Sequence, residues 1–396
     1  MTERLYYNDC YLRDFRARIV DTADDGRRVY LDRTAFYPTS GGQPFDAGTL
    51  RGAKVIDVID EEERIGHIVD TPLSAAQGET PVSEAQVEGR IDWERRFDHM
   101  QQHTGQHLLS AVLEELFAIP TLSFHMGADV STIEVGAAAL DTGRIERAEE
   151  RCAEIVSEAR PVVITFDEAS EDLGLRKASQ RSGTLRVVSI TGIDRSACGG
   201  THVRSTAEIG PVFIRKLDKI RGNVRLEFVC GFRSLKQARA DFRALLEISR
   251  HLSTPVEQTP AVVAAQVERI RLLEKSNQRM AADLAGREGR ELWAATEPGA
   301  DGIRRVTQPG PIDDVLRVRA QAFVAQGEAV FIAVSENPPA VLLAASADSG
   351  IHAGKLVQAA VTSAGGRGGG NQALAQGSVP SSADLKRVVA LLNPAS

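Results

Sequence analysis

The spacing of apolar residues along the chain predicts where β-strands give way to helices. Between residue 1 and about residue 95, short runs alternate between apolar and polar residues, with turn-forming clusters between them, which predicts strands. The run KVIDVID at 54–60 shows this alternation, and the DDG sequence at 24–26 marks a hairpin turn. This first part of the chain is therefore expected to be rich in β-structure.

From Asp92 the apolar residues recur at helical spacing, and the helix is expected to end near Pro120. One face of this helix carries Leu108, Leu109, Val112, Leu113, Leu116 and Phe117. A second helix is predicted for 144–159, stopped before Pro161. Apolar runs then predict strands at 162–166, 185–190, 212–217 and 224–228. We expect this region to fold as a domain that mixes helix and sheet.

A long amphipathic helix is predicted for 261–293, after the character of the sequence changes near Gly231. Its apolar stripe contains one polar position, Asn277, and otherwise consists of Val263, Val267, Ile270, Leu273, Met280 and Leu284. The stripe is typical of a coiled-coil arm, which would allow a homodimer, and equally of a connector packed on its own domain. The EPGADG sequence at 297–302 predicts a linker. Residues 303–396 alternate between helix and strand, with strands at 330–334 and 341–345.

These patterns predict a chain of mixed α and β structure, α+β in class, with four parts. They are a β-rich, barrel-like subdomain at 1–92, an α/β domain at 93–235, a helical connector at 236–298 and a C-terminal α/β domain at 299–396.

Composition and charge narrow the class of protein. The chain has 396 residues, of which 42% are hydrophobic, so it can build packed cores. Its 47 Lys and Arg against 54 Asp and Glu give a net charge of −7, which argues against coating nucleic acid but leaves room for a local basic surface. The sequence contains no apolar run as long as a membrane span of ~18 residues. Charged residues also occupy the N-terminus, where a signal peptide would be apolar, so we expect a cytoplasmic protein.

Two pairs of residues predict a metal site. In HTGQH, His103 and His107 lie one helical turn apart, and in ACGGTH, Cys198 and His202 are also four residues apart. Three imidazole nitrogens and one thiolate form a ligand set that zinc accepts, and the glycines allow a tight bend around the ion. His99 lies on the same helix face and is an alternative ligand to His107. Cys152 and Cys230, like Cys10, are expected to be thiols and not disulfide partners.

The pattern argues against a metalloprotease of the HExxH type, because the residues between His103 and His107 are Thr, Gly and Gln and do not include the glutamate that serves as its general base.

A glycine-containing stretch, AFYPTSGGQPFDAG at 35–48, is a candidate ligand-binding loop. Thr39 and Ser40 offer hydroxyl groups, and Gly41 and Gly42 permit close approach of the backbone to a ligand. By composition alone, a surface turn is the favoured interpretation.

The three motifs SGGQPFDAG, HTGQHLL and ACGGTHV, in this order, resemble the alanyl-tRNA editing domain. This domain occurs in alanyl-tRNA synthetases and in freestanding AlaX-type editing proteins. The similarity covers residues 1 to about 235 and continues through the helical connector into a C-terminal region that resembles a DHHA1 domain. Because the editing-like region starts almost at Met1, the synthetase's aminoacylation domain is not expected, and the chain looks like a long-form AlaX protein.

The resemblance implies an aminoacyl-tRNA hydrolase that acts in trans on mischarged tRNA(Ala), chiefly seryl-tRNA(Ala), with glycyl-tRNA(Ala) as a further candidate. It implies that His103, His107, Cys198 and His202 hold Zn2+, with Thr39, His103 and His107 as the catalytic residues. It also implies that Thr39 helps to sense the serine hydroxyl and that the substrate lies against Thr39, Ser40, Gly41, Gly42 and Gln43.

Two further segments are candidates for binding tRNA. Positive charge is concentrated after the CGGTH sequence, at Arg215, Lys216, Lys219, Arg221 and Arg225, although ordinary strand-edge charges would look the same. The second segment resembles the glycine motif of DHHA1 domains and is expected to be a loop that leads into a helix, with the residues Gly366, Arg367, Gly368, Gly369 and Gly370.

Two alternatives to this function stay open. In the first, the chain is an enzyme that edits a different mischarged tRNA, since threonyl-tRNA synthetases have a related zinc-binding editing domain. In the second, it is a tRNA-binding protein in which zinc is structural and no reaction occurs.

Overall fold

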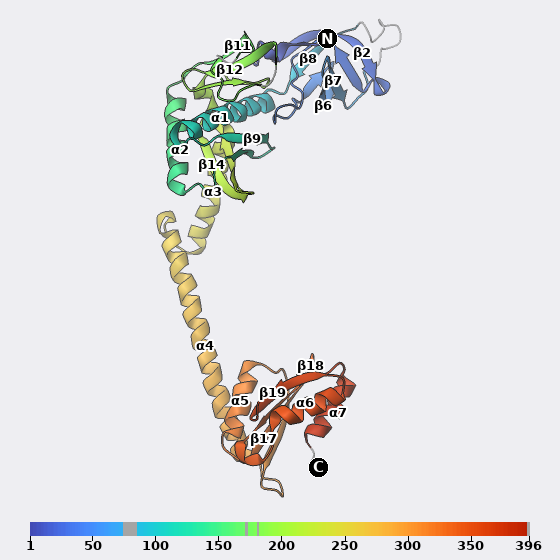
Figure 1. The fold of residues 1–396 in the computed structure, drawn as a ribbon, viewed down its shortest axis with the longest axis vertical. Helices are drawn as coiled ribbons and strands as arrows, with labels where there is room; N and C mark the ends of the chain where they lie inside the picture. The colour runs from blue at the N-terminus through green and yellow to red at the C-terminus, as the bar shows by residue number, and fades with distance from the viewer. Residues whose placement is uncertain (74–84, 171–172, 180–181, 394–396) are drawn as a thin grey trace. The chain divides into compact units, whose positions relative to one another are not determined.

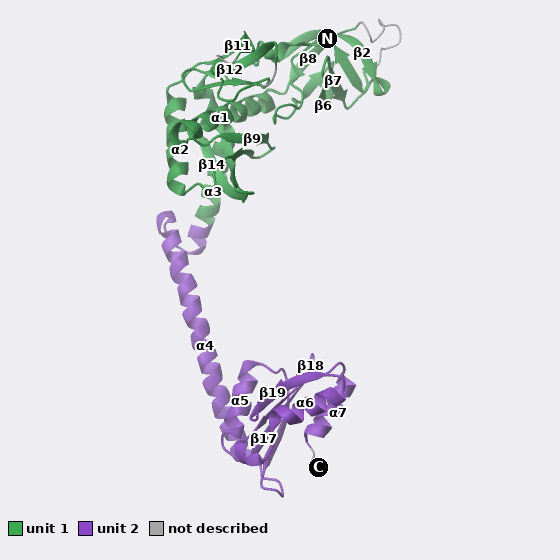
Figure 2. Ribbon diagram, in the orientation of Figure 1, with its two compact units in different colours: residues 1–247 green, residues 248–396 purple. Residues whose placement is uncertain are grey.

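We describe the fold from a computed structural model, which covers residues 1–73, 85–170, 173–179 and 182–393. The chain divides into two compact units, residues 1–247 and 248–396 (Figure 2). Each unit contains both helices and sheets, which confirms the predicted mixture of α and β structure.

Unit 1 begins with a closed six-stranded barrel (Figure 1). The alternation predicted from the sequence is visible in β2, whose residues Phe15, Ala17 and Ile19 are buried while the residues between them are exposed. A short 3-10 turn at Asp24–Gly26 joins β2 to β3, as the DDG sequence predicted. The barrel strands in spatial order are β2 (Asp14–Ala23), β3 (Arg28–Leu31), β7 (Arg64–Val69), β6 (Ala53–Glu61), β5 (Gly48–Leu50) and β8 (Gln86–Ile91). Outside it, β1 (Glu3–Arg4) pairs in parallel with β4 (Arg33–Thr34).

The rest of unit 1 packs around helix α1 (Trp93–Phe117), which matches the predicted helix. Asp92 caps its N-terminus by accepting a hydrogen bond from the Arg95 amide, and Ala118 ends it in a left-handed conformation. Beside α1 lie helix α2 (Thr142–Ser157) and two antiparallel sheets. One sheet has the strand order β14 (Val212–Ile220), β15 (Asn223–Cys230), β10 (Ser131–Val135) and β9 (Thr121–Met126). The other has the order β11 (Val162–Glu168), β12 (Thr184–Ile190) and β13 (Asp194–Ala197).

All four strands that the sequence predicted in this region are present, as β11, β12, β14 and β15. Three others, β9, β10 and β13, were not predicted, because they are short or carry polar residues such as Ser123 and Arg195 at positions that sheet pairing uses.

Unit 2 is built on one five-stranded sheet. The end of helix α3 (Gly231–His251) leads into it, and helix α4 (Thr259–Ala295) confirms the predicted long helix. The α4 stripe is largely open to solvent, with Val267 and Ile270 about half exposed. The sheet order is β16 (Arg304–Pro309), β17 (Ala329–Glu336), β18 (Pro339–Ala345), β20 (Leu374–Ser378) and β19 (Arg367–Gly370). The remaining helices are α5 (Asp314–Val324), α6 (Ala353–Ser363) and α7 (Ser382–Leu392).

One expectation for unit 2 was wrong. The glycine motif was expected to be a loop leading into a helix, but 367–370 form the edge strand β19, which pairs with β20. Glycine suits this strand because β20 and helix α6 lie very close: a Cβ on Gly368 would lie 2.7 Å from the Gly377 backbone, and one on Gly370 would lie 2.2 Å from the Leu374 carbonyl oxygen.

A membrane-crossing helix is not found among the described residues, since their helices lack a sufficiently long apolar stretch.

The barrel contains a buried histidine that should make unit 1 sensitive to acid. His67 is fully buried, its Nδ1 lies 2.9 Å from the Val29 carbonyl oxygen, and its Nε2 lies 2.8 Å from the Thr34 hydroxyl. The Thr34 oxygen already accepts from the Phe36 amide, so its hydrogen is available for a neutral imidazole. Burial lowers the pKa of His67 from 6.5 to about 4.

Below pH 6.5 the unfolded chain takes up a proton that folded His67 does not bind until about pH 4. We expect unit 1 to lose up to about 3 kcal/mol of stability across this window because of this group. Urea unfolding at several pH values should show a smaller loss in His67→Gln than in the unaltered protein or in the exposed control His125→Gln. Equal losses in all three proteins would contradict the assignment.

Candidate metal centre

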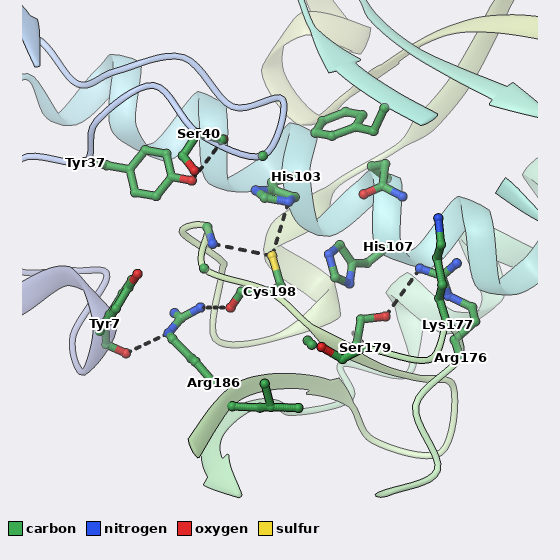
Figure 3. A pocket seen from close by; sticks show the side chains of 18 of the residues that line it. Tyr7, Tyr37, Ser40, His103, His107, Arg176, Lys177, Ser179, Arg186 and Cys198 are labelled. Atoms are coloured by element: carbon green, nitrogen blue, oxygen red, sulfur yellow. Dashed lines mark hydrogen bonds between the residues drawn. The ribbon is translucent and has the colours of Figure 1, made fainter. Parts of the chain in front are cut away.

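Helix α1 and the turn after β13 bring four metal-binding side chains together. Ligand atoms of His103, His107, Cys198 and His202 all lie within 4.8 Å of one another. The Cys198 sulfur is 3.5 Å from His103 Nε2 and 3.3 Å from His202 Nε2. Figure 3 shows the side chains of His103, His107 and Cys198 converging on this point. Two sequence motifs separated by about ninety residues therefore meet around one small volume.

The second nitrogen of each imidazole has its own partner, and these partners fix the tautomers. Gln43 Oε1 accepts from the Thr201 amide at 3.1 Å, so its oxygen, and not its nitrogen, faces His103 Nδ1 at 2.8 Å. His103 Nδ1 must therefore carry a hydrogen and donate it. With that proton on Nδ1, the lone pair of Nε2 is free to point at the cluster.

His202 and His107 are held in the same way. The Thr104 hydroxyl donates to the Met100 carbonyl at 2.8 Å, so it must accept from His202 Nδ1 at 3.1 Å. His107 Nδ1 lies 2.8 Å from a carboxylate oxygen of Asp194, which can only accept. The Nε2 atoms of the three imidazoles thus face the cluster, the arrangement that a bound metal requires once each Nε2 is free of hydrogen.

Asp194 is itself held in place. Its other carboxylate oxygen accepts from Arg176 Nε at 2.6 Å, and the Ser196 hydroxyl lies 3.0 Å from Asp194 Oδ2. Burial alone would raise the pKa of the Asp194 carboxyl, but His107 and then Arg176 outweigh it and lower this pKa to about 2. The carboxylate therefore remains charged and oriented toward His107.

The charges in the cluster favour a thiolate at Cys198. Burial opposes ionisation, but the neighbouring His103 and His107 hold the pKa of the Cys198 thiol well below its usual value. Burial also lowers the pKa of His202, to about 3, which keeps this ring neutral. In the protein without a metal, burial is outweighed at His107 by Asp194 and Cys198, which raise its pKa to about 9.

Glycines in both motifs are required by close contacts. A Cβ on Gly200 would lie 2.1 Å from His103 Cε1, so the CGG turn can approach the helix only without a side chain there. A Cβ on Gly105 would lie 2.2 Å from the Cys230 sulfur, which packs helix α1 against strand β15. Cys152 and Cys230 are buried thiols, as predicted.

The glycine loop of the barrel reaches the cluster through Gln43. Besides its contact with His103, Gln43 donates to the Thr201 hydroxyl at 2.8 Å and is fully buried. Gly42 has a positive φ of 84°, and a Cβ there would lie 2.7 Å from the Phe124 carbonyl oxygen. Thr39 is exposed, and its hydroxyl oxygen accepts a hydrogen bond from the Phe45 amide.

A buried ion pair fixes the same loop to helix α1. Arg96 and Asp46 are both fully buried, and Arg96 Nε lies 3.0 Å from each Asp46 carboxylate oxygen. The guanidinium group also donates to the carbonyls of Cys10 and Ala35, and Asp46 accepts from the Tyr37 amide. This pair lies two turns before His103, so it sets how the loop that carries Gln43 meets the helix.

A cavity of about 720 Å³ opens beside the cluster. Of the residues that the sequence indicated, Ser40, Gly41, His103, His107 and Cys198 line it, whereas Thr39, Gly42, Gln43 and His202 are not among its described lining residues. Several further residues line the cavity but were not indicated by the sequence, since most of them belong to no motif that is visible in it. They include Tyr7, Tyr37, Gln106, Thr121, Ser123, Phe166, Arg176, Lys177 and Arg186.

His99 does not belong to the cluster, although it was an alternative ligand. It is buried on α1 outside the four-residue group, and its Nδ1 has no hydrogen-bond partner among the described residues. Burial, with help from Arg95 and Arg233, lowers its pKa to about 3, so the ring is neutral.

The predicted RNA-binding residues lie outside the cavity lining. Arg215 pairs with Asp241, and Lys216 lies 2.9 Å from Asp218, while Lys219, Arg221 and Arg225 are exposed on the hairpin of β14 and β15. The glycine motif at 366–370 belongs to unit 2 and is mostly exposed. Their role in RNA binding stays a prediction.

Comparison with known proteins finds related domains and related whole chains. Residues 185–226 match the family described as threonyl and alanyl tRNA synthetase second additional domain, and residues 262–395 match the DHHA1 domain. The chain is 32% identical to the alanyl-tRNA editing protein AlaX-L of Pyrococcus horikoshii, over 96% of this chain and 95% of that protein. It is 37% identical to AlaX-M of Methanosarcina acetivorans, over 58% of this chain and 98% of the relative. It is 30% identical to the alanine–tRNA ligase of Pyrococcus abyssi, over 98% of this chain but 43% of the ligase.

Loss of the buried ion pair should destabilise unit 1 strongly. In Arg96→Met, Asp46 remains as a buried charge without its partner, so we expect a loss of about 3–5 kcal/mol in urea unfolding. The matched control Arg16→Met removes an exposed pair with Glu88, in which both side chains are about three-quarters exposed, and should cost less than about 1 kcal/mol. Similar losses in the two variants would show that the buried pair does not hold the loop to the helix.

Proposed function

The chain belongs to the family of alanyl-tRNA editing proteins, and from this premise we propose that it is a trans-acting aminoacyl-tRNA hydrolase. Its substrate would be mischarged tRNA(Ala), with seryl-tRNA(Ala) first and glycyl-tRNA(Ala) second. The family membership rests on a relative matched over nearly the whole of both chains. The observation that carries the proposal is the cluster of three oriented imidazoles and one thiol beside an open cavity.

Zinc is the metal that fits the cluster best. Three nitrogens and one sulfur are a ligand set that Zn2+ binds in tetrahedral geometry, with Zn–N near ~2.0–2.1 Å and Zn–S near ~2.3 Å. Those bond lengths place a sulfur and a nitrogen ligand roughly 3.5 Å apart. The observed separations from Cys198, 3.5 and 3.3 Å, support this fit. His103, His107, Cys198 and His202 would hold the ion, which when bound could polarise the ester carbonyl, activate water or hold the substrate amino group.

The residues of the chain itself would orient the metal ligands and the substrate. Gln43 and Asp194 hold the two α1 histidines with their Nε2 atoms toward the cluster. Ser40 and Gly41 line the cavity and could contact the aminoacyl group. Thr39 is outside the described cavity lining but adjoins Ser40, which lines it, and remains the proposed residue for the serine hydroxyl. Its oxygen accepts from a backbone amide, which leaves its hydrogen free to donate.

Rejection of alanyl-tRNA would follow from unpaired polar groups. Alanine lacks the hydroxyl of serine, so polar groups positioned for that hydroxyl would lose their partner when alanine binds. An aminoacyl ester is already labile, and positioning with water activation could suffice for its hydrolysis.

A second candidate function is a tRNA-binding protein with structural zinc. It is favoured by one feature of the site: four protein ligands around one ion leave no open position, which is typical of structural zinc. Editing of another mischarged tRNA is the other alternative, favoured by the domain match, which names both threonyl- and alanyl-tRNA synthetases.

One assay separates these functions. We expect the full-length protein to deacylate seryl-tRNA(Ala) and to leave alanyl-tRNA(Ala) intact, with glycyl-tRNA(Ala) as an intermediate case. His103→Ala should lower the rate at least 100-fold because it removes a metal ligand, whereas His125→Ala, an exposed histidine on β9, should not change it. Absence of deacylation in the zinc-loaded protein would favour the binding protein, and activity on seryl-tRNA of another acceptor alone would favour the other editing function.

The contact between Asp194 and His107 should contribute to metal affinity. Removal of such a second partner typically costs ~10–100-fold in affinity. We therefore expect Asp194→Asn to bind Zn2+ at least 10-fold more weakly in a competition titration with a chromophoric chelator. Asp241→Asn, in an exposed pair, serves as the control. Equal affinities of the two variants would contradict the orienting role of Asp194.

A further inference from the structure

The described lining of the cavity beside the cluster carries several cationic side chains, although Arg176 among them is paired with Asp194. Among the described residues, the lining contains four cationic side chains, Arg4, Arg176, Lys177 and Arg186, and one carboxylate, Asp60. Asp60 is already paired with Arg4 at 2.7 Å. Lys177 is exposed and forms no ion pair with the residues that the structure describes. In Figure 3, Arg176 and Lys177 lie on the His107 side of the cavity and Arg186 lies between Tyr7 and Cys198.

Two exposed apolar side chains lie in the same lining. Phe166 on β11 is 49% exposed, and Leu122 on β9 is 46% exposed. β11 is one of the two outer strands of its sheet, and Phe166 on this strand lines the cavity. An exposed phenyl ring and an exposed lysine in one cavity lining contribute little to folding, but they are the combination on which an unpaired nucleic acid strand binds.

The sheet register connects this ring to the metal ligands. Phe166 lies directly opposite Arg186 on β12, and the Arg186 carbonyl accepts from the Cys198 amide at 3.0 Å. Cross-strand neighbours point to the same face of a sheet. Phe166, Arg186 and Cys198 therefore form one row across three strand positions, about 10 Å long at ~4.8 Å per strand. Arg186 holds the middle of the row by donating to the carbonyls of Cys198 and Tyr7.

We propose that Phe166 and Lys177 form a binding platform for the unpaired 3′ end of the RNA substrate. The phenyl ring would stack on a terminal base, and the Lys177 ammonium would pair with a neighbouring phosphate. The amino acid is esterified to the terminal ribose, so an ester held at the metal cluster keeps the base of that same nucleotide nearby, on the side of the cavity where the row ends at Phe166. This inference rests on the proposed function, because it assumes that the ester lies at the cluster.

The platform is tested by steady-state deacylation of seryl-tRNA(Ala) with the full-length protein. Phe166→Ala and Phe166→Leu should each raise KM about 10-fold with kcat within twofold, because the stacking surface is lost while the metal site is intact. Phe166→Trp, which keeps an aromatic ring, should have the same KM as the unaltered protein. The control Phe213→Ala removes a phenylalanine of similar exposure, 44%, on β14 outside the cavity lining and should leave both constants unchanged.

Direct binding separates this inference from the proposed function. A fluorescent single-stranded RNA oligonucleotide ending in CCA should bind Phe166→Ala about 10-fold more weakly than the unaltered protein. Lys177→Ala should reduce the slope of log affinity against log salt by about one.

If the unaltered protein deacylates no mischarged tRNA, the proposed function fails, and the oligonucleotide still tests the platform. The platform is overturned if Phe166→Ala matches Phe213→Ala in both KM and oligonucleotide affinity. It is also overturned if Phe166→Leu behaves as the unaltered protein, since an apolar contact, as with a protein partner, would then explain the surface.

Discussion

Three buried imidazole rings can present their lone pairs to one point only if something else holds their second nitrogens. Here the partners of the Nδ1 atoms come from three parts of unit 1: Gln43 from the barrel loop, Thr104 from helix α1 and Asp194 from strand β13. The cluster is therefore complete only when barrel, helix and sheet are assembled. Helix α1 carries His103, His107 and other polar residues, yet it is buried on nearly all sides between residues 99 and 113. The need to assemble the cluster from all three parts explains this burial.

The same constraint explains the close approaches around the cluster. The CGG turn lies so near to His103 that a side chain at position 200 would overlap the ring, and the barrel loop lies so near to β9 that Gly42 is needed beside Phe124. The buried Arg96–Asp46 pair joins the loop and the helix at the other end of the contact. A buried pair of this kind contributes defined geometry more than net stability, because desolvation offsets much of its attraction.

The sequence predicted the parts of this site whose spacing is regular. A pair of histidines one helical turn apart and a Cys-x-x-x-His turn are visible without a structure, and the helices and strongest strands follow from the apolar period. The sequence could not reveal Asp194, Arg176 or Phe166, because only the folded chain brings Asp194 to His107, Arg176 to Asp194 and Phe166 to the cavity. It misjudged β19, whose glycines resemble a loop in composition but serve as a strand where backbones touch. Nor could it decide against His99, which shares the helix face but lies outside the cluster.

The central claim is that one sulfur and three nitrogens of this chain bind a single zinc ion. X-ray absorption at the zinc edge, on full-length protein purified with one equivalent of zinc, measures this first shell directly. The account predicts one sulfur at ~2.3 Å and three nitrogens at ~2.0–2.1 Å, with the imidazole scattering that three histidine ligands produce. A shell without sulfur, or one made of water and carboxylate oxygens, would contradict it.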